Sequence, residues 1–321
     1  MLEVVKVTGR DDLAQVFVAR TKDGSLIEFV ESVQPPVPRD KKWVLIVSTL
    51  KGCPVRCPIC DAGSHYRGKL STTEILAQIE HLVRRRYPDG VVPIPKLKVQ
   101  FARMGEPALN DAVLEVLRLL PQRLRAPGLM PCVSTVAPRG RESFFEELLA
   151  IKQEWYPGGR FQMQFSLHAS DETTRRALVP IDTWSFTEMA AFGRRFFAPG
   201  DRRVTLNFAA GTTTALDAGA IAREFDPRYF AIKLTPINPT AAARRAKLLG
   251  RIDPDDPTGN ERLADSFRAL GFETIVSIGE LEENAIGSNC GMLAESSRRA
   301  ALSTAHAPGE LTRGRESAPA C

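Results

Sequence analysis

The sequence has 321 residues, of which 43% are apolar and 25% are charged, and its formal net charge is +5. This composition is typical of a folded globular protein with a sizeable core. No apolar run is long enough to cross a bilayer, and the first residues lack the apolar stretch of a secretory signal. These features argue against a membrane or secreted protein, and we expect a cytoplasmic one with no membrane partner.

Residues 1–42 are expected to form a short extension. Within it, residues 15–31 alternate apolar and polar side chains around Asp23-Gly24, which predicts a β-hairpin with a tight turn. Residues 34–38 read Gln-Pro-Pro-Val-Pro, which predicts a stiff linker to the following segment.

From residue 43 onward, apolar strand-like runs alternate with amphipathic helical segments. The strands are expected at residues 43–50, 97–104, 130–137, 161–169, 204–210, 229–237 and 272–278. The helices are expected at residues 71–86, 111–124, 142–153, 171–178, 185–196, 215–225 and 259–270. The last residues are rich in Ala, Ser, Gly and Pro, and we expect a disordered tail over 300–321.

Six repeats of strand and helix predict an α/β fold with a parallel sheet and right-handed crossovers. The sheet could curl into a partial (β/α)6 barrel over residues 43–299 or stay open as a doubly wound sheet. In both folds, ligands bind at the carboxyl ends of the strands.

Three of the six cysteines, Cys53, Cys57 and Cys60, form a CxxxCxxC motif directly after the expected strand at residues 43–50. In a chain of this size, such spacing indicates metal binding rather than disulfides. Three thiolates on one loop can ligate three irons of a cubane [4Fe–4S] cluster and leave the fourth iron open. The alternative is a zinc site with His65 as the fourth ligand.

This motif in this place resembles that of the radical S-adenosylmethionine (SAM) superfamily, whose members have a partial (β/α)6 barrel. The resemblance implies that SAM binds the open iron and that its reductive cleavage gives a 5′-deoxyadenosyl radical, which abstracts hydrogen. It also implies a flavodoxin-type reducing partner. We therefore expect the partial barrel, with a [4Fe–4S] cluster and SAM as cofactors.

Four further motifs lie at the expected strand ends. Residues 102–110 (ARMGEPALN) contain Gly105, where the backbone can approach a ligand closely, and Glu106, whose carboxylate can hold an ammonium group. The other three are VSTV with Ser134, SLHA with Ser166 and His168, and LTPINP with Asn238. Hydroxyls at strand ends suit hydrogen bonds to a ribose or a carboxylate. A histidine there can equally be an ordinary core residue.

Together these strings resemble those of the class A radical SAM methyltransferases, such as the rRNA adenine C2 and C8 methylases. The resemblance implies that Glu106 binds the amino group of SAM. It also implies that the SAM site includes Gly105, Ser134, Ser166, His168 and Asn238.

Residues 271–295 resemble the C-terminal segment of the same methylases, in which one cysteine carries the methyl group. That residue here is Cys290, in the string Asn289-Cys290-Gly291-Met292. The resemblance implies that one SAM methylates its thiolate and a second SAM activates that methyl group for addition to an electron-poor aromatic carbon. Without the resemblance, a lone cysteine is more often a small buried apolar residue.

The chain departs from these methylases where they have a second cysteine, which resolves a covalent enzyme–substrate adduct. Ile46 occupies that position. Cys132, which shares a strand face with Ser134, and Cys321 in the tail are the candidates to replace it, although both could equally be inert thiols.

Two more departures concern the substrate. Residues 1–42 are too few for the N-terminal helical domain of the rRNA methylases, which helps to bind RNA. The segment before Cys290 contains Gly279, Glu280, Glu282 and Glu283, and acidic residues oppose RNA binding.

The sequence thus predicts a radical SAM methyltransferase that methylates an sp2 carbon of an RNA adenine or another heteroaromatic substrate. The alternative is a radical SAM enzyme that abstracts hydrogen from a small molecule or peptide without methyl transfer. A third hypothesis, from another class, is a zinc-stabilised RNA-binding protein without turnover.

Overall fold

A single open sheet runs through the whole fold. The computed structural model describes residues 2–33, 37–212, 216–253, 255–278, 286 and 291–305. Within them, ten strands lie in the order β1 to β10. Their bounds are β1 Glu3–Gly9, β2 Ala14–Arg20, β3 Leu26–Ser32, β4 Trp43–Val47, β5 Leu97–Phe101, β6 Leu129–Thr135, β7 Gln162–Ser166, β8 Val204–Ala209, β9 Phe230–Thr235 and β10 Glu273–Val276.

The direction of pairing changes once along this sheet. Strands β1 to β4 pair antiparallel, and strands β4 to β10 pair parallel. Strand order follows chain order without reversal, whereas a doubly wound sheet reverses its order at a switch point. The predicted partial barrel is therefore confirmed over the doubly wound alternative, and the sheet does not close on itself.

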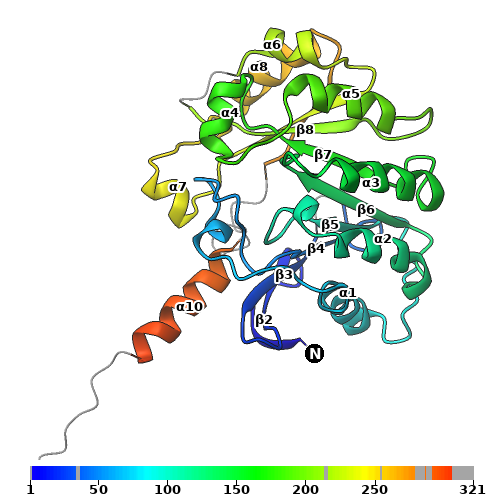
Figure 1. Ribbon diagram of the computed structural model, residues 1–321, viewed down its shortest axis with the longest axis vertical. Helices are drawn as coiled ribbons and strands as arrows, with labels where there is room; N and C mark the ends of the chain where they lie inside the picture. The colour runs from blue at the N-terminus through cyan, green and yellow to red at the C-terminus, as the bar shows by residue number, and fades with distance from the viewer. Residues whose placement is uncertain are drawn as a thin grey trace, which may run out of the picture.

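Helices cover the outer face of the parallel part of the sheet (Figure 1). They are α1 Thr72–Arg86, α2 Ala112–Arg123, α3 Glu142–Trp155, α4 Glu172–Leu178, α5 Phe186–Phe196, α6 Ala218–Glu224 and α8 Pro257–Arg268. Two further helices, α7 Ala241–Arg245 and α10 Met292–Ala305, lie elsewhere. Short 3-10 turns, η1 Asp61–Ser64 and η2 Pro107–Leu109, follow β4 and β5. The loop after β4 and helix α7 lie on the other side, near the carboxyl ends of the strands (Figure 1).

Local sequence explains where helix α1 begins and how it packs. Ser71 and Glu74 form a reciprocal capping box. The apolar residues Ile75, Ile79 and Leu82 recur at helical spacing and are fully buried in the core between helices and sheet. Among the described residues, no helix has both the length and the apolar composition that a membrane span requires.

The N-terminal extension contains more structure than the sequence predicted. The hairpin is confirmed as β2 and β3, with Asp23 and Gly24 in its turn. Strand β1 was missed because none of its residues is buried, so it has no alternating apolar pattern. The sheet runs on through the expected boundary at residue 42, because β3 pairs with β4.

The chain end also differs from the expectation. Helix α10 continues to Ala305, so the boundary predicted at residue 300 falls inside a helix, and residues 306–321 lie outside the described residues. The short helix α7 was missed as well, because five residues give too little periodicity to detect.

Candidate active site

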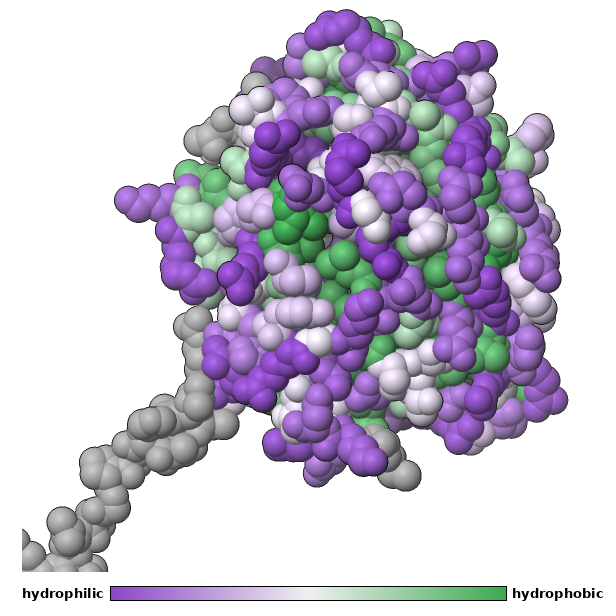
Figure 2. Space-filling model, in the orientation of Figure 1, coloured by the Kyte–Doolittle hydropathy of each residue, from purple (hydrophilic) through white to green (hydrophobic). Residues whose placement is uncertain are grey.

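The three cysteines of the CxxxCxxC motif line one cavity of about 250 Å³ at the carboxyl ends of β5, β6 and β7. They lie on the loop between β4 and α1, and each is partly exposed. Apolar residues Val55, Val136 and Val179 pack against this loop. Figure 2 shows an apolar area near the centre of this face, which hydrophilic residues surround.

The thiols are close enough to influence one another. Burial raises the pKa of Cys53 to about 12, and the negative charge of Cys60 adds to this effect. Burial raises the pKa of Cys57 well above its ordinary value, again with a contribution from Cys60. The side chains of Cys53 and Cys57 are therefore protonated until a metal replaces the protons, as in other thiolate sites.

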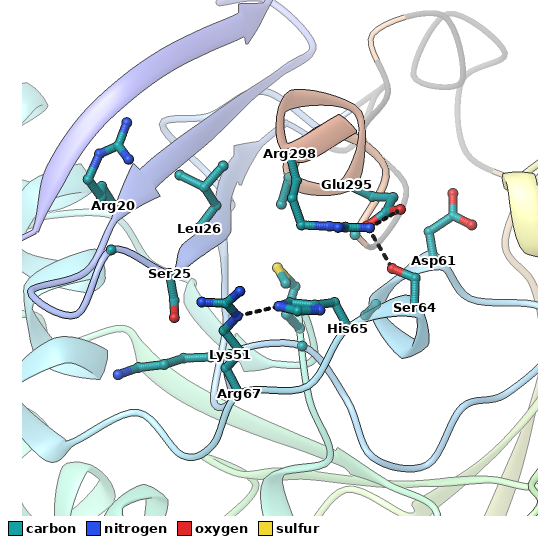
Figure 3. Close-up of a pocket in the computed structure, with 16 residues that line it drawn as sticks. Arg20, Ser25, Leu26, Lys51, Asp61, Ser64, His65, Arg67, Glu295 and Arg298 are labelled. Atoms are coloured by element: carbon teal, nitrogen blue, oxygen red, sulfur yellow. Dashed lines mark hydrogen bonds and ion pairs between the residues drawn. The ribbon is translucent and has the colours of Figure 1, made fainter. Parts of the chain in front are cut away.

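His65 does not join the cysteines. Its Nε2 accepts a hydrogen bond from Nε of Arg67, and it lines a second cavity of about 230 Å³ (Figure 3). Among the residues with described positions, no three His, Cys, Asp or Glu side chains form a group that could hold one metal ion. The fourth ligand that the zinc alternative requires is thus turned away from the cysteine cavity.

Glu106 lies where the sequence placed it, at the end of β5, and it is 4% exposed. Its carboxylate accepts hydrogen bonds from the amide of Ala108 at 3.0 Å, from the amide of Val136 at 2.8 Å and from the hydroxyl of Thr135. Burial raises its pKa to about 6. These partners fix a carboxylate at the cavity wall that can receive an ammonium group.

Gly105 and the two serines line the same cavity. Gly105 has φ +102°, and a Cβ there would lie 2.5 Å from Cβ of Leu50, so glycine is required for packing against the cysteine loop. The side chains of Ser134 and Ser166 make no hydrogen bond to any described residue, which leaves both hydroxyls available to a ligand.

His168 follows β7 in the left-handed conformation, with φ +66°, and also lines the cavity. Burial, assisted by the charge of Arg175, lowers its pKa to about 4, so the ring is neutral near pH 7. Its Nδ1 accepts a hydrogen bond of 3.1 Å from the amide of Ala209. The proton therefore resides on Nε2, which is left as the ring's donor.

Of the remaining expected site residues, one lies away from the cavity and the other is not described. Asn238 is exposed on the loop after β9 and is not among the cavity-lining residues. Cys290, together with the acidic segment 279–285, lies outside the described residues.

The residue after Cys290 is described, and it packs against the cysteine loop. Gly291 has φ +83°, and a Cβ there would lie 2.3 Å from the amide nitrogen of Ala62. Its own amide donates to Glu28 at 3.0 Å, and the amide of Ala294 donates to Glu28 at 2.6 Å. Glu28 also pairs with Arg103 at 2.5 Å, and both side chains are buried.

Gly291 also lines the second cavity, which lies between the hairpin, the cysteine loop and α10. Figure 3 shows Arg298 reaching toward Glu295, which accepts a hydrogen bond from Ser64. The start of α10 is thus tied to the loop that carries the three cysteines.

Sequence reasoning missed several polar residues of the main cavity. Gln100, Gln164 and Lys233 line it, each on the inner face of its strand. The alternation of side chains along a strand could have identified them, because residues two positions apart point to the same face of the sheet. The same rule correctly predicted that Cys132 points inward with Ser134.

The chain is similar to known methyltransferases in sequence. It is 28% identical over 296 residues to the "Probable dual-specificity RNA methyltransferase RlmN" of Desulfitobacterium hafniense strain Y51, covering 88% of this chain and 76% of the relative. It is 30% identical over 299 residues to the protein of the same name from Frankia casuarinae, covering 88% of this chain and 65% of the relative. No family model matches the sequence.

The fold is also similar to that of a known methyltransferase. A crystal structure of a radical SAM methyltransferase from Sphaerobacter thermophilus matches with a TM-score of 0.71 and 25% identity, over 91% of this chain and 80% of that chain. The chain is a homologue of the radical SAM methyltransferases. The predicted resemblance is therefore confirmed, and with it a [4Fe–4S] cluster and SAM as the cofactors of this family. The donor set of this cavity, three thiols on one loop, fits such a cluster.

Proposed function

We propose that this chain is a class A-like radical SAM methyltransferase, which transfers a methyl group to an sp2 carbon of an RNA adenine or a related heteroaromatic ring. The observation that carries the proposal is the single cavity that gathers Cys53, Cys57 and Cys60 with Glu106 and the free serine hydroxyls. In this proposal the three thiolates hold the cluster, which supplies the electron for reductive SAM cleavage and hence for hydrogen abstraction.

The residues around the cavity would orient SAM. Glu106 would accept hydrogen bonds from its ammonium group, because the carboxylate is already fixed by two backbone amides. Ser134 and Ser166 would donate to its carboxylate or ribose, and the Nε2 proton of His168 offers a third donor. Asn238 is also proposed to contact SAM. For this contact, the loop after β9 would have to turn toward the cavity.

Cys290 would carry the methyl group. Its thiolate would attack the methyl carbon of SAM, so that a new sulfur–carbon bond forms while the sulfonium bond breaks and S-adenosylhomocysteine leaves. This step requires Cys290 to be near the cysteine loop. The contact of the neighbouring Gly291 with Ala62 supports that location.

The relatives named as RNA methyltransferases support RNA as the substrate, and such a substrate implies a cytoplasmic location. The net charge of +5 is compatible with a polyanionic partner. A flavodoxin-type protein is proposed as the electron donor, on the resemblance alone.

Cys132 is the proposed second thiol. Cys132 lines the cavity. It is level with Ile46 across the sheet, because Ile46 pairs with Gln100 on the next strand and Gln100 pairs with Cys132 on the strand after that. Adjacent strands are about 4.8 Å apart, so the two backbones are separated by about 10 Å. If Cys132 resolves the adduct, Cys132→Ala traps enzyme joined to substrate; free methylated product from this variant rejects the role.

The second candidate function is hydrogen abstraction without methyl transfer. The observation that favours it is Ile46, which contributes no thiol and packs partly buried against an apolar cluster that includes Val16 and Val30 of the hairpin. Under this hypothesis the cavity binds cluster and SAM in the same way, and Cys290 has no chemical role.

The test uses anaerobically reconstituted enzyme, a reductant and SAM that carries a deuterated methyl group. Bulk RNA from a methylase-deficient strain is offered beside free adenosine, and the digested nucleosides are analysed by mass spectrometry. Methyladenosine that contains the label, absent with Cys290→Ala, supports the proposal. Cleavage of SAM without labelled nucleoside, from RNA or adenosine, would favour the second function.

A further inference from the structure

Polar side chains lie at more than one depth inside the barrel. Gln100 on β5, Gln164 on β7 and Lys233 on β9 line the cavity below the cysteines. Lys98 lies two residues before Gln100 and therefore faces the same way. Closed parallel barrels usually fill this space with layers of branched apolar side chains. The polar lining instead indicates a space that holds a ligand.

Five cationic side chains gather below the cysteine cavity: Lys42 before β4, Lys96 before β5, Lys98 on β5, Arg202 before β8 and Lys233 in the second half of β9. Lys42 is repelled by all the other four, so they lie close together. Burial and this repulsion lower the pKa of Lys42 to about 8. Burial and repulsion from Lys98 likewise lower the pKa of Lys233 to about 8.

Three of these lysines lack a partner. Lys96, Lys98 and Lys233 make no ion pair or hydrogen bond with their side chains to any described residue. Arg202 is held in place by Gln162, whose Oε1 accepts from its Nε at 2.8 Å. Like charges in a partly enclosed space destabilise the fold unless an anion neutralises them.

No carboxylate in the described part of the chain forms an ion pair with Lys96, Lys98 or Lys233. Glu273, at the start of β10, is the nearest carboxylate by register, since it pairs with Ala231 two residues before Lys233. It is exposed and forms an ion pair with Arg203 at 2.9 Å. The positive charge in the lumen is therefore not balanced by the strand that flanks it.

Asn207 provides an independent sign of a missing ligand. Its side chain is 8% exposed, and its Oδ1 is buried with no hydrogen-bond partner. It pairs in register with Ser166 on one side and Lys233 on the other, so all three share the inner face. A buried amide oxygen without a partner costs free energy, which a hydrogen-bond donor on a ligand would recover.

We propose that the lower lumen of the barrel is a binding site for a phosphate-type oxyanion, held by Lys98 and Lys233 and hydrogen-bonded to Asn207. Lysine ammonium groups bind phosphate oxygens through charge-assisted hydrogen bonds. Monohydrogen phosphate also has one hydroxyl, which can donate to Oδ1 of Asn207. The site adjoins the expected position of SAM, since Lys233 lines the same cavity as the cysteines and Asn207 pairs in register with Ser166. Phosphate binding can nevertheless be measured without methyl transfer.

The experiment measures binding of inorganic phosphate to the reconstituted enzyme by calorimetry and by the shift of its melting temperature. Potassium chloride at matched ionic strength is the reference. The variants are Lys98→Met and Lys233→Met, which keep most of the side-chain volume. Lys22→Met, at the exposed hairpin turn, is the matched control. Adenosine 5′-monophosphate forms a second arm.

We expect saturable phosphate binding by the wild type and the Lys22→Met control. Each lumen variant should bind at least tenfold more weakly, and its ligand-free form should melt at a higher temperature because one repelling charge is gone. Tighter binding of the mononucleotide than of phosphate would identify a nucleotide phosphate as the natural ligand, and equal or weaker binding would identify free phosphate.

Three results would overturn the proposal. They are a lack of saturable phosphate binding, an equal effect of chloride, and wild-type affinity in both lumen variants. Lower melting temperatures of the ligand-free lumen variants would also count against it, since they would assign the lysines a structural role.

Discussion

The variant Glu28→Gln removes one buried charge while it keeps the shape of the side chain. The carboxylate of Glu28 joins Arg103 at 2.5 Å, the amide of Gly291 at 3.0 Å and the amide of Ala294 at 2.6 Å. Removal of one partner of a buried ion pair costs about 3 to 5 kcal/mol. We expect a loss of this size rather than the loss of about 1 kcal/mol for a helix cap, because Glu28 and Arg103 are both enclosed.

Two assays separate the local effect from general destabilisation. Urea unfolding gives the change in free energy, and hydrogen exchange reports the amides of Gly291 and Ala294. Glu31→Gln is the matched control, since Glu31 lies on the same strand, is 1% exposed and pairs with Arg85 and Arg86. We expect both variants to lose stability, and only Glu28→Gln to speed exchange at the two amides.

A loss below about 1 kcal/mol in Glu28→Gln would refute the reasoning, because the ion pair would then contribute no more than an exposed one. Unchanged exchange at Gly291 and Ala294 would refute the second part. The hairpin would then not hold the start of α10 against the cysteine loop.

Three further predictions concern the site. Gly291→Ala should lower the free energy of unfolding in urea by about 1 to 3 kcal/mol more than Gly24→Ala does, because its Cβ would meet the cysteine loop. Gly24→Ala is the control, since Gly24 also has a positive φ (+82°) but has open space around it, and it should lose about 1 kcal/mol. Glu106 has its pKa raised from 4.5 to about 6, so the native state binds a proton more tightly than the unfolded state does. The free energy of unfolding should therefore fall by about 2 kcal/mol as the pH rises from well below 4.5 to well above 6. Glu106→Gln should abolish that fall. Cys57→Ser should prevent assembly of a brown cluster, measured by iron content and visible absorbance, whereas Cys132→Ser should not.

The sequence predicted those parts of the fold that local patterns encode. The period of apolar residues identified the strands and helices that alternate from residue 43. Strand parity placed Cys132 and Ser134 in the cavity. Each of these inferences needs only residues that are near one another in the chain.

Contacts between distant segments could not be predicted in this way. The anchoring of Gly291 by Glu28 joins residues 263 positions apart, and no local period reports it. Asn238 was expected in the cavity from its motif, but the direction of a loop side chain depends on how the loop packs. The cations of the lumen were scattered in the sequence, and only the curl of the sheet brings Lys42 near Lys233.

Methylation of Cys290 tests the central claim most directly. The enzyme is purified without oxygen, its cluster is rebuilt, SAM is added without a reductant, and the peptide that contains Cys290 is analysed by mass spectrometry. The account predicts one added methyl group on Cys290 and none on the corresponding peptide of Cys290→Ala. An unmodified Cys290, in a protein that still cleaves SAM to 5′-deoxyadenosine once reductant is supplied, would contradict it.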